Sequence, residues 1–224
     1  MSTENPKQIL FTQFAAVAKA VAHPHRLELL EQLAQGERSV EVLADRVRAT
    51  VTNASQHLQH MRRAGLVAAR RSGKFVFYRL ADDAVLDLVA ALRRVAETQS
   101  AEVDRVVRGY FDQRDTLEPV TRTELMERLQ AGLVTVLDVR PADEFALGHV
   151  AGAINLPLVE LERRLADLDS KHEIIAYCRG PYCVLSYEAV ARLRARGFRI
   201  RRLEDGYPEW RAAGLPVEAA SPSA

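Results

Sequence analysis

Long hydrophobic runs are absent from this sequence, and no apolar stretch approaches the roughly 20 residues that a membrane-spanning helix needs. The polar segment over residues 1–8 is not followed by the apolar core of a signal peptide. We therefore expect a cytoplasmic protein that does not associate with a membrane. Its 224 residues, 48% hydrophobic and 27% charged, suit one large or two small globular domains.

Cysteine is also scarce. The chain has two cysteines, Cys178 and Cys183, so it has no framework of disulfides like that of small secreted domains. This composition is typical of a protein in a reducing compartment.

Acidic residues are missing from one segment. The net charge of the whole chain is only +1, yet residues 46–81 contain no Asp or Glu. A field of one sign over one segment favours a polyanionic partner, while a solvated basic face is the simpler alternative. The basic residues of this segment are Arg46, Arg48, Arg62, Arg63, Arg70, Arg71, Lys74 and Arg79.

Helical patterns follow one another closely in the first third of the chain. The last of them is polar and basic, opens at Thr50 or Thr52 and ends at Gly65, which suits the position after a helix. Three helices with short joints, ending in such a segment, predict a helix-turn-helix. Apolar spacing and caps place the helices over residues 8–22, 27–33, 40–47 and 50–61.

Two short β-prone runs, 66–71 and 74–80, follow the helix-turn-helix pattern. Ser72-Gly73 separates them, which predicts a hairpin with a tight turn and a basic tip beside the recognition helix. Amphipathic helical patterns over residues 85–95 and 103–111 come next. Their apolar content indicates a dimer interface or packing between domains.

Four motifs over about residues 8–98 resemble the ArsR/SmtB family of winged-helix repressors. The resemblance implies a mainly helical winged helix-turn-helix domain that forms a homodimer through its first and last helices and binds a palindromic operator DNA. The motifs are Ala22-His23-Pro24-His25-Arg26-Leu27, Ser55-Gln56-His57-Leu58, Ala64-Gly65-Leu66-Val67 and Lys74-Phe75-Val76-Phe77-Tyr78-Arg79-Leu80.

The resemblance also implies which side chains meet DNA. Asn and Gln bond bidentately to adenine, and Ser and Thr serve either base, whereas Arg and Lys hold phosphates without reading sequence. The expected base-reading residues are Thr52, Asn53, Ser55, Gln56 and Gln59, and the expected phosphate-binding residues are Arg62, Arg63, Arg70, Arg71 and Lys74.

The metal ligands of sensing members of that family are missing. Some members carry paired cysteines in the third helix, where residues 39–43 of this chain contain none. Others place Asp and His ligands along the last helix, but only Asp82 and Asp83 remain here, too few for a zinc site. We therefore expect no metal site and no other cofactor.

Histidines that lie close together in the sequence could still bind a metal ion. His57 and His60 lie three residues apart on one expected helix, but we interpret His57 as a packed residue and His60 as facing DNA or solvent. His23 and His25 flank a helix start and receive the same interpretation.

Composition changes after Asp115, and the rest of the chain alternates strands with helices. We expect strands over 134–139, 174–177 and 200–203, and helices over 123–130, 158–168 and 185–196. This pattern predicts an α/β domain with a parallel sheet between helical layers. The expected division is a winged-helix domain at 1–98, a connecting helix and linker at 99–117, the α/β domain at 118–218 and a disordered tail at 219–224.

The stretch from Ile174 to Leu185 combines a β-prone run, a short loop with Gly180 and Pro181, and the start of a helical pattern. Backbone N–H groups converge on such a loop, and together with the positive end of the helix dipole they stabilise an anion. A thiol there should have its pKa lowered from about 8.5 into the range of about 3.5–7.5. Cys178 is therefore our candidate nucleophile, with an inert buried cysteine as the alternative.

Motifs over about residues 118–218 resemble a rhodanese domain. The resemblance implies that Cys178 attacks a sulfane-sulfur donor such as thiosulfate, a polysulfide or a persulfide, and that a thiol acceptor later removes the sulfur from the Cys178 persulfide. It assigns the sulfur-cradling loop to Arg179, Gly180, Pro181, Tyr182 and Cys183. The motifs are Asp138-Val139-Arg140, Glu144-Phe145, the run from Gly148 to Pro157, and Gly206-Tyr207-Pro208-Glu209-Trp210.

The loop departs from the family pattern at two positions. Pro181 removes one N–H, so we expect slower turnover than in a dedicated transferase. Cys183 replaces the usual Ser or Thr and is either a small helix-start residue or a resolving thiol that attacks a Cys178 persulfide or sulfenate. A disulfide between them needs a Cα–Cα distance below about 7 Å, which the sequence does not give. Val184 stands where a phosphatase-type loop needs arginine, which disfavours phosphate-ester chemistry.

The leading hypothesis from the sequence is a transcriptional repressor that senses or transfers sulfane sulfur through a Cys178 persulfide. One alternative is a sulfurtransferase enzyme whose DNA-binding half localises or autoregulates it. Another is a dithiol sensor for oxidants or arsenite that uses Cys178 and Cys183.

Overall fold

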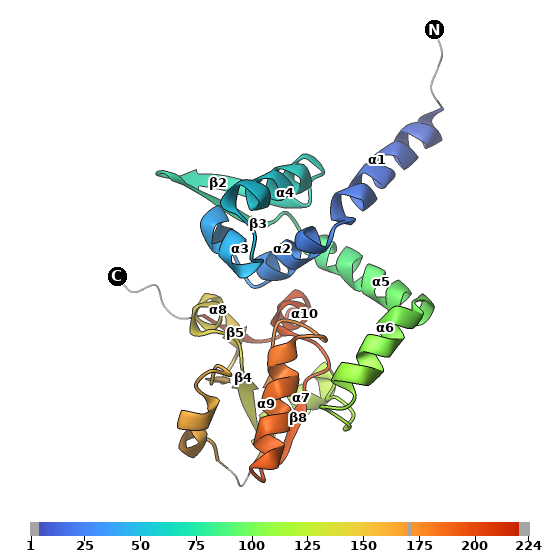
Figure 1. The fold of residues 1–224 in the computed structure, drawn as a ribbon. Coiled ribbons are helices and arrows are strands. Elements are labelled where there is room, and N and C mark those ends of the chain that lie inside the picture. Colours follow the sequence, from blue (N-terminus) through green and yellow to red (C-terminus); the bar gives the residue numbers. More distant parts are fainter. Residues whose placement is uncertain (1–4, 170–171, 220–224) are drawn as a thin grey trace. The chain divides into compact units, whose positions relative to one another are not determined.

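The computed structural model describes residues 5–169 and 172–219 (Figure 1). Contacts divide the chain into two units, Met1–Ala90 and Ala91–Ala224, and each is described by itself below. Within the described ranges, no helix combines the length and the hydrophobicity needed to cross a membrane. The tail expected at the C-terminus lies outside these ranges from residue 220 onward.

The expected helices of the first unit are all present. Ser39 caps one of them as predicted, and Thr50 rather than Thr52 begins the recognition helix, because Thr50 Oγ1 accepts a hydrogen bond from the Asn53 backbone N–H at 3.2 Å. That helix is followed by Gly65 at φ +76°, a conformation that glycine adopts readily. The helices are α1 (Pro6–Val21), α2 (Pro24–Ala34), α3 (Val40–Arg46) and α4 (Val51–Arg63).

A three-stranded antiparallel sheet completes the winged helix-turn-helix, with the strand order β1–β3–β2. Ser72 pairs with Phe75, so Gly73 and Lys74 form the turn, one residue later than the sequence suggested. Gly73 has φ +59°, and its freedom to adopt that angle fixes the turn there. The strands are β1 (Arg38–Ser39), β2 (Val67–Ser72) and β3 (Phe75–Leu80).

Both amphipathic patterns that follow are helical. The helix α5 (Ala84–Gln99) contains the boundary between the two units. Ser100 then begins α6 (Ala101–Val106), because its Oγ accepts a hydrogen bond from the Val103 N–H at 3.4 Å, and α6 continues into a π-helical turn, η1 (Val107–Phe111).

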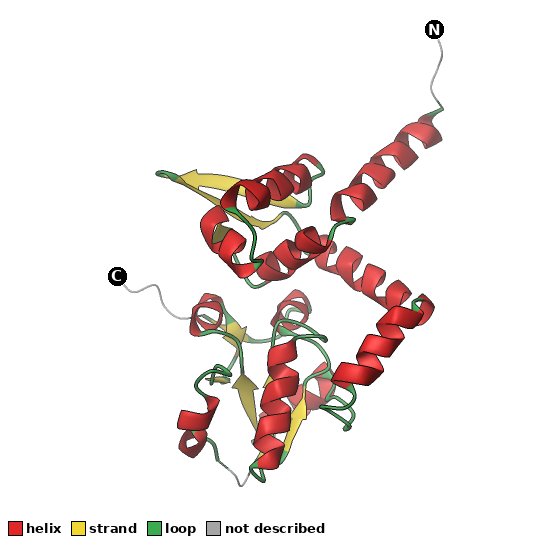
Figure 2. Ribbon diagram, viewed as in Figure 1, coloured by secondary structure: helices red, strands yellow, loops and turns green. Residues whose placement is uncertain are grey.

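The second unit is built on a four-stranded parallel sheet with the order β6–β4–β7–β8 (Figure 2). The sequence predicted three of these strands and their parallel direction but missed β6, and it also missed a short antiparallel pair formed by β5 and β9. The remaining elements are α7 (Arg122–Gln130), β4 (Val134–Asp138), α8 (Ala142–Leu147), β5 (His149–Val150), β6 (Ile154–Asn155), β7 (Glu173–Tyr177), α9 (Val184–Ala195), β8 (Ile200–Arg202), α10 (Tyr207–Ala212) and β9 (Val217–Glu218).

The prediction of an α-helix over residues 158–168 is wrong. Two 3₁₀ turns, η2 (Leu161–Arg163) and η3 (Leu165–Asp167), occupy this segment instead. Its leucines at 158, 161, 165 and 168 recur every three or four residues, a spacing that short 3₁₀ turns share with an α-helix.

Each face of the parallel sheet is covered by helix, which gives three layers. Alternation along β7 places Ile174 and Ala176 on the face packed against α9, and Ile175 and Tyr177 on the opposite face with residues of α7 and α10. Cys178, the next residue, continues the alternation and belongs to the α9 side. The carboxyl end of a central strand therefore delivers the candidate nucleophile, as the sequence suggested.

A buried polar network fixes that end of β7. Asp138 and Arg140 are both 0% exposed and form an ion pair at 2.6 Å, and Arg140 also donates to the Gly148 carbonyl at 2.8 Å. The Tyr177 hydroxyl donates to Asp138 at 2.5 Å and accepts from the Val150 N–H at 3.0 Å. Burial, and next the Asp138 charge, raise the pKa of Tyr177, so the phenol stays a donor.

Tyr177→Phe should lower the free energy of unfolding of the second unit by about 1–3 kcal/mol, because the buried Val150 N–H loses its acceptor. Urea unfolding followed by the fluorescence of Trp210, the chain's single tryptophan and fully buried, measures this. Tyr110→Phe, at a half-buried phenol, is the control and should change stability by less than about 0.5 kcal/mol. Equal effects of the two variants would contradict the role given to the network.

Candidate functional site

The recognition helix α4 has one buried and one open side. Ala54, Leu58 and Met61 are buried at helical spacing, which turns the polar side chains outward. Gln59 Nε2 donates to Ser55 Oγ at 3.2 Å, so these two expected base readers are already joined. Among the expected base-reading residues, Ser55 is half-buried and the exposed ones are Thr52, Asn53, Gln56 and Gln59.

The expected phosphate-binding residues are all exposed, but Arg70 differs from the others. Its guanidinium forms a forked pair with Glu37, with Nε 2.9 Å from Oε1, and it stacks on the Phe77 ring at 4.7 Å. Glu37 lies outside the acid-free segment of the sequence, so only folding brings it to the wing. Among the described residues, no carboxylate pairs in this way with the other exposed cations of this surface, which are Arg62, Arg63, Arg71 and Lys74.

The inner side of α4 carries His57. Burial lowers the pKa of His57 first, and the nearby His23, Arg26 and His25 lower it further. The imidazole is therefore neutral at pH 7, which fits the expected packed position.

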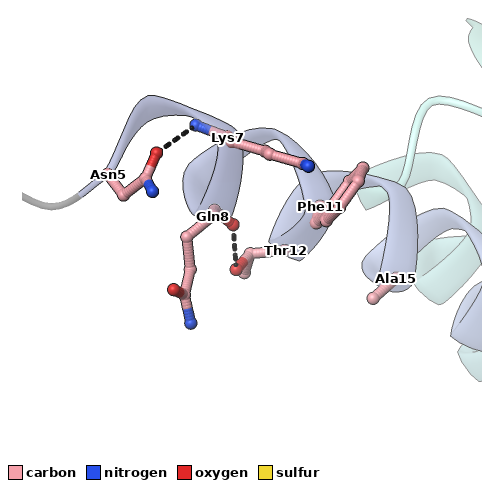
Figure 3. Close-up of a pocket in the computed structure, with 6 residues that line it drawn as sticks. All are labelled: Asn5, Lys7, Gln8, Phe11, Thr12 and Ala15. Atoms are coloured by element: carbon pink, nitrogen blue, oxygen red, sulfur yellow. Dashed lines mark hydrogen bonds between the residues drawn. The ribbon is translucent and has the colours of Figure 1, made fainter.

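A pocket in the first unit is lined by residues of α1 and its cap (Figure 3). All of its lining residues come from this one segment, so the pocket is an open surface along one side of α1 and is not an enclosed cavity. Phe11 and Phe14 are 57% and 61% exposed on α1, and Ile9 and Leu10 are exposed beside them. The lining residues are Asn5, Lys7, Gln8, Phe11, Thr12 and Ala15.

Cys178 and Cys183 are joined by a disulfide bond across the loop between β7 and α9. Their Cα atoms are 6.1 Å apart, within the range that a simple disulfide spans. Cys178 is 1% exposed and Cys183 6% exposed, and both pack in the apolar cluster on the α9 side of the sheet. The structure thus answers a question that the sequence left open: the two sulfur atoms can meet.

In this bridged form one backbone N–H of the loop is missing and another is already engaged. Pro181 has no N–H, and the Cys183 N–H donates to the Gly180 carbonyl at 3.1 Å. The Cys183 carbonyl accepts from both the N–H and the hydroxyl of Ser186, at 3.1 and 2.9 Å. These hydrogen bonds fix the backbone between Gly180 and the start of α9.

Two further elements hold the beginning of the loop. The Arg179 guanidinium pairs with the fully buried Glu144, with Nη2 2.7 Å from Oε1. Gly206 packs directly on the loop backbone: a methyl group added there would lie 2.3 Å from the Arg179 carbonyl carbon and 2.4 Å from the Gly180 nitrogen. The Tyr207 N–H donates to the Cys178 carbonyl at 3.0 Å.

Tyr182 lies in the loop between Cys178 and Cys183, and its side chain contacts two helical segments. Its hydroxyl faces the Glu97 carboxylate of α5, and its ring lies 5.1 Å from the Phe111 ring of η1, centroid to centroid. Burial, and next the bond to Glu97, raise the pKa of Tyr182 to about 12. Sequence reasoning treated Tyr182 only as part of the cradle and gave no sign of its partner on α5.

A second contact joins α5 to the support of the loop. The Glu209 carboxylate accepts from the Gly206 N–H at 3.1 Å and lies 3.9 Å from Arg93 of α5. Burial is the main reason that the pKa of Glu209 is raised. Arg93 and Glu97 lie one turn apart on α5. They thus contact the segment of Glu209, which packs on the loop, and Tyr182 of the loop itself.

Comparison with known proteins divides the chain in the same way. A family model described as a helix-turn-helix domain matches residues 21–70, and one described as a rhodanese-like domain matches residues 121–213. The chain is 44% identical over 216 residues to the HTH-type transcriptional regulator Rv0324 of Mycobacterium tuberculosis, an alignment that covers 96% of this chain and 95% of that relative. The chain belongs to the ArsR/SmtB-like family of HTH-type transcriptional regulators.

Each half of this ArsR/SmtB-like regulator has relatives of its own. A sulfurtransferase of Allochromatium vinosum is 31% identical over 87 residues, which cover 38% of this chain and 79% of the relative. A solution structure of a homodimeric winged helix-turn-helix domain from Mycobacterium bovis, described as a possible ArsR-family regulator, is 39% identical. It covers 46% of this chain and 94% of that one, with a TM-score of 0.41. Both resemblances drawn from the sequence are confirmed at the level of the family.

Gly206→Ala should force the cysteine loop of this regulator out of place, because the methyl group would meet rigid backbone at 2.3–2.5 Å. We expect a loss of about 1–3 kcal/mol, typical of overpacking, measured by the thermal transition of the near-UV circular dichroism of the buried aromatic residues. Gly109→Ala is the control, since nothing lies within 4 Å of its added methyl. A Gly206→Ala variant as stable as Gly109→Ala would show that the loop is not held from this side.

Glu97→Gln should lower the pKa of Tyr182 from about 12 toward the ordinary value near 10, since the carboxylate favours the neutral phenol. In the unmodified protein the stabilisation from the neutral Tyr182 phenol is complete below about pH 10 and is lost as the pH rises through about 12. The measurement is the tyrosinate absorbance difference between each protein and its Tyr182→Phe derivative. Glu102→Gln, at an exposed ion pair, should leave it unchanged, and an unmoved pKa in Glu97→Gln would refute the contact.

Proposed function

We propose that this regulator is a repressor whose affinity for operator DNA is set by sulfur chemistry at Cys178 and Cys183. The observation that carries the proposal is the meeting of the two cysteines in a loop whose residue Tyr182 faces Glu97 of α5 and packs on Phe111 of η1. The helix α5 starts at Ala84 in the winged-helix unit and ends in the unit that holds the loop. A change in the loop therefore acts directly on a helix that both units share.

The DNA-binding half supplies the operator contacts in this proposal. The exposed polar side of α4 reads base edges through Asn53 and Gln56, and Thr52, Ser55 and Gln59 add further contacts. Arg62, Arg63, Arg71 and Lys74 hold phosphates, which gives affinity that falls as salt rises. Arg70 joins them only if it leaves Glu37.

The operator is bound by a homodimer in this proposal. A helix as exposed as α1 gains little from its own propensity, because isolated helices of this length are marginal in water. Its exposed apolar residues, and those of α5, need a partner to cover them, and a second copy of the chain is the partner that a palindromic site requires. These residues are Ile9, Leu10, Phe11, Phe14, Leu92 and Val95.

The first chemical step is the loading of sulfur. The Cys178 thiolate attacks the outer sulfur of thiosulfate, the S–S bond of the donor breaks with its electron pair on sulfite, and Cys178 becomes a persulfide. Polysulfide or a low-molecular-weight persulfide reacts in the same way, with a shorter polysulfide or a thiolate as the leaving group. Because Cys178 is nearly closed off in the bridged form, we expect small donors to be favoured.

The second step is the closing of the bridge. The Cys183 thiolate attacks the inner sulfur of the Cys178 persulfide, a bond forms between the two cysteine sulfurs, and hydrosulfide leaves. The dithiol loses two electrons and the sulfane sulfur gains them, so no other oxidant is needed. In a reducing cytoplasm, where disulfides are mostly transient or sensory, cellular thiols would return the pair to the open form.

Wild-type protein, reduced beforehand, should lose operator affinity by about 5- to 150-fold when sodium thiosulfate or polysulfide is added, the range of ordinary allosteric coupling. The operator is a duplex selected from a random library by the reduced protein, and binding is followed by fluorescence anisotropy at fixed salt. Cys178→Ser should bind this duplex and ignore the donor, and two chains should bind each duplex. Mass spectrometry of the same samples reports persulfide or disulfide at Cys178.

Cys183→Ser separates the two forms of the signal. If the persulfide is enough, this variant still responds to the donor, whereas loss of the response with a persulfide present assigns the signal to the bridge. An undiminished response in Cys178→Ser would remove the proposed mechanism.

A sulfurtransferase enzyme is the second candidate, because the sulfurtransferase relative covers the half of the chain that holds Cys178. In that case the persulfide hands its outer sulfur to an acceptor nucleophile and Cys178 returns as a thiolate. A thiosulfate-to-cyanide assay decides between the two: sustained turnover supports the enzyme, and a single loading event supports the regulator. The dithiol sensor for oxidants or arsenite rests on the same Cys178–Cys183 bond, and it predicts a response to those agents without any donor.

A further inference from the structure

Three histidines that are scattered in the sequence meet in the first unit. His23 is the N-cap of α2, His25 lies in its first turn, and His57 lies on α4. One ring nitrogen from each lies within 4.8 Å of the other two. The ring centroids of His23 and His57 are 4.4 Å apart, and His25 lies 5.4 and 5.8 Å from them. From the sequence we expected no metal, and we weighed His23 and His25 apart from His57 and His60.

The hydrogen bonds of this cluster leave ring nitrogens available. His23 Nδ1 accepts from the His25 backbone N–H at 3.2 Å, which fixes the ring and leaves its Nε2 for another partner. His25 Nδ1 is buried and, among the described residues, finds no hydrogen-bond partner. A buried polar atom without a partner is costly, so a native structure generally supplies one, in the form of water or a bound ion.

The chemistry of the surroundings selects the kind of ion. The charges of Arg26 and His60 act on His57, and among the described residues no carboxylate belongs to the cluster, so a hard cation such as Mg²⁺ or Ca²⁺, which needs oxygen ligands, is excluded there. Neutral imidazoles are good ligands for borderline ions instead. We propose that His23, His25 and His57 form a site for a divalent ion of the zinc, cobalt, nickel or copper class, with solvent as the fourth ligand.

Small side-chain movements would complete the geometry. Ligand nitrogens on a tetrahedral zinc ion are about 3.3 Å apart, given Zn–N bonds of about 2.0–2.1 Å. The three nitrogens, already within 4.8 Å, need to approach by at most about 1.5 Å. We expect rotations of the half-buried rings to supply this approach, with both helices left in place.

An ion at this place ties the start of α2 to the recognition helix. His57 follows Gln56, one of the expected base readers, so the ion would hold the helix that reads DNA at a fixed distance from α2. This second input does not depend on the cysteines or on the proposed sulfur chemistry.

The test is a titration of the tag-free, full-length reduced protein with cobalt(II) chloride. We expect saturation at one ion per chain, visible ligand-field bands typical of nitrogen ligands, and no near-ultraviolet thiolate-to-cobalt band. Zinc chloride should displace the cobalt. His25→Gln and His57→Gln should weaken binding at least about tenfold, while His60→Gln, on the same helix outside the cluster, should retain it.

Several results would overturn the site. These are the absence of saturable cobalt binding, a thiolate band that persists in His25→Gln and His57→Gln, or an equal loss in His60→Gln. Circular dichroism of each metal-free variant shows that it is folded, and a zinc-dependent rise of Tm in the wild type but not in His25→Gln gives a second measurement. Operator affinity with and without zinc is measured afterwards: an unchanged affinity leaves the ion site in place and concerns only its effect on DNA.

Discussion

The buried ion pair between Asp138 and Arg140 is the constraint on which the cysteine loop depends. Removing one partner from such a pair leaves a buried charge, at a cost of about 3–5 kcal/mol. Here the Tyr177 hydroxyl donates to Asp138 and the Gly148 carbonyl accepts from Arg140, and these hydrogen bonds stabilise the buried pair. Because Tyr177 immediately precedes Cys178, fixing the phenol also fixes the place where β7 ends and where the first thiol lies.

The loop that follows is held by three groups from other elements. Glu144 holds Arg179, the backbone of Gly206 packs on the loop, and Glu97 holds Tyr182. The first two belong to the rhodanese-like fold, whereas Glu97 belongs to α5, which begins in the winged-helix unit. Coupling between sites needs an element with two discrete arrangements, and the open and bridged forms of one dithiol would supply them.

Much of the fold could be predicted from the sequence because its signals are local. Apolar spacing, the caps at Ser39 and Thr50, and the turn near Gly73 depend on neighbouring residues, and they placed the helices of the winged-helix unit within a few residues. The β-prone runs likewise predicted a parallel sheet with Cys178 at a strand end. The short strand β6 was missed and 158–168 was taken for an α-helix, since few residues carry too little periodicity to decide.

By itself, the sequence determined that the chain joins a basic winged helix-turn-helix to an α/β domain with a cysteine in its loop. Only the tertiary structure decided which distant residues meet. It bonded Cys178 to Cys183, placed Glu37 on Arg70 and Glu97 beside Tyr182, and gathered His23 and His25 around His57. Such contacts depend on the packing of whole elements against one another, and no pattern of neighbouring residues records that packing.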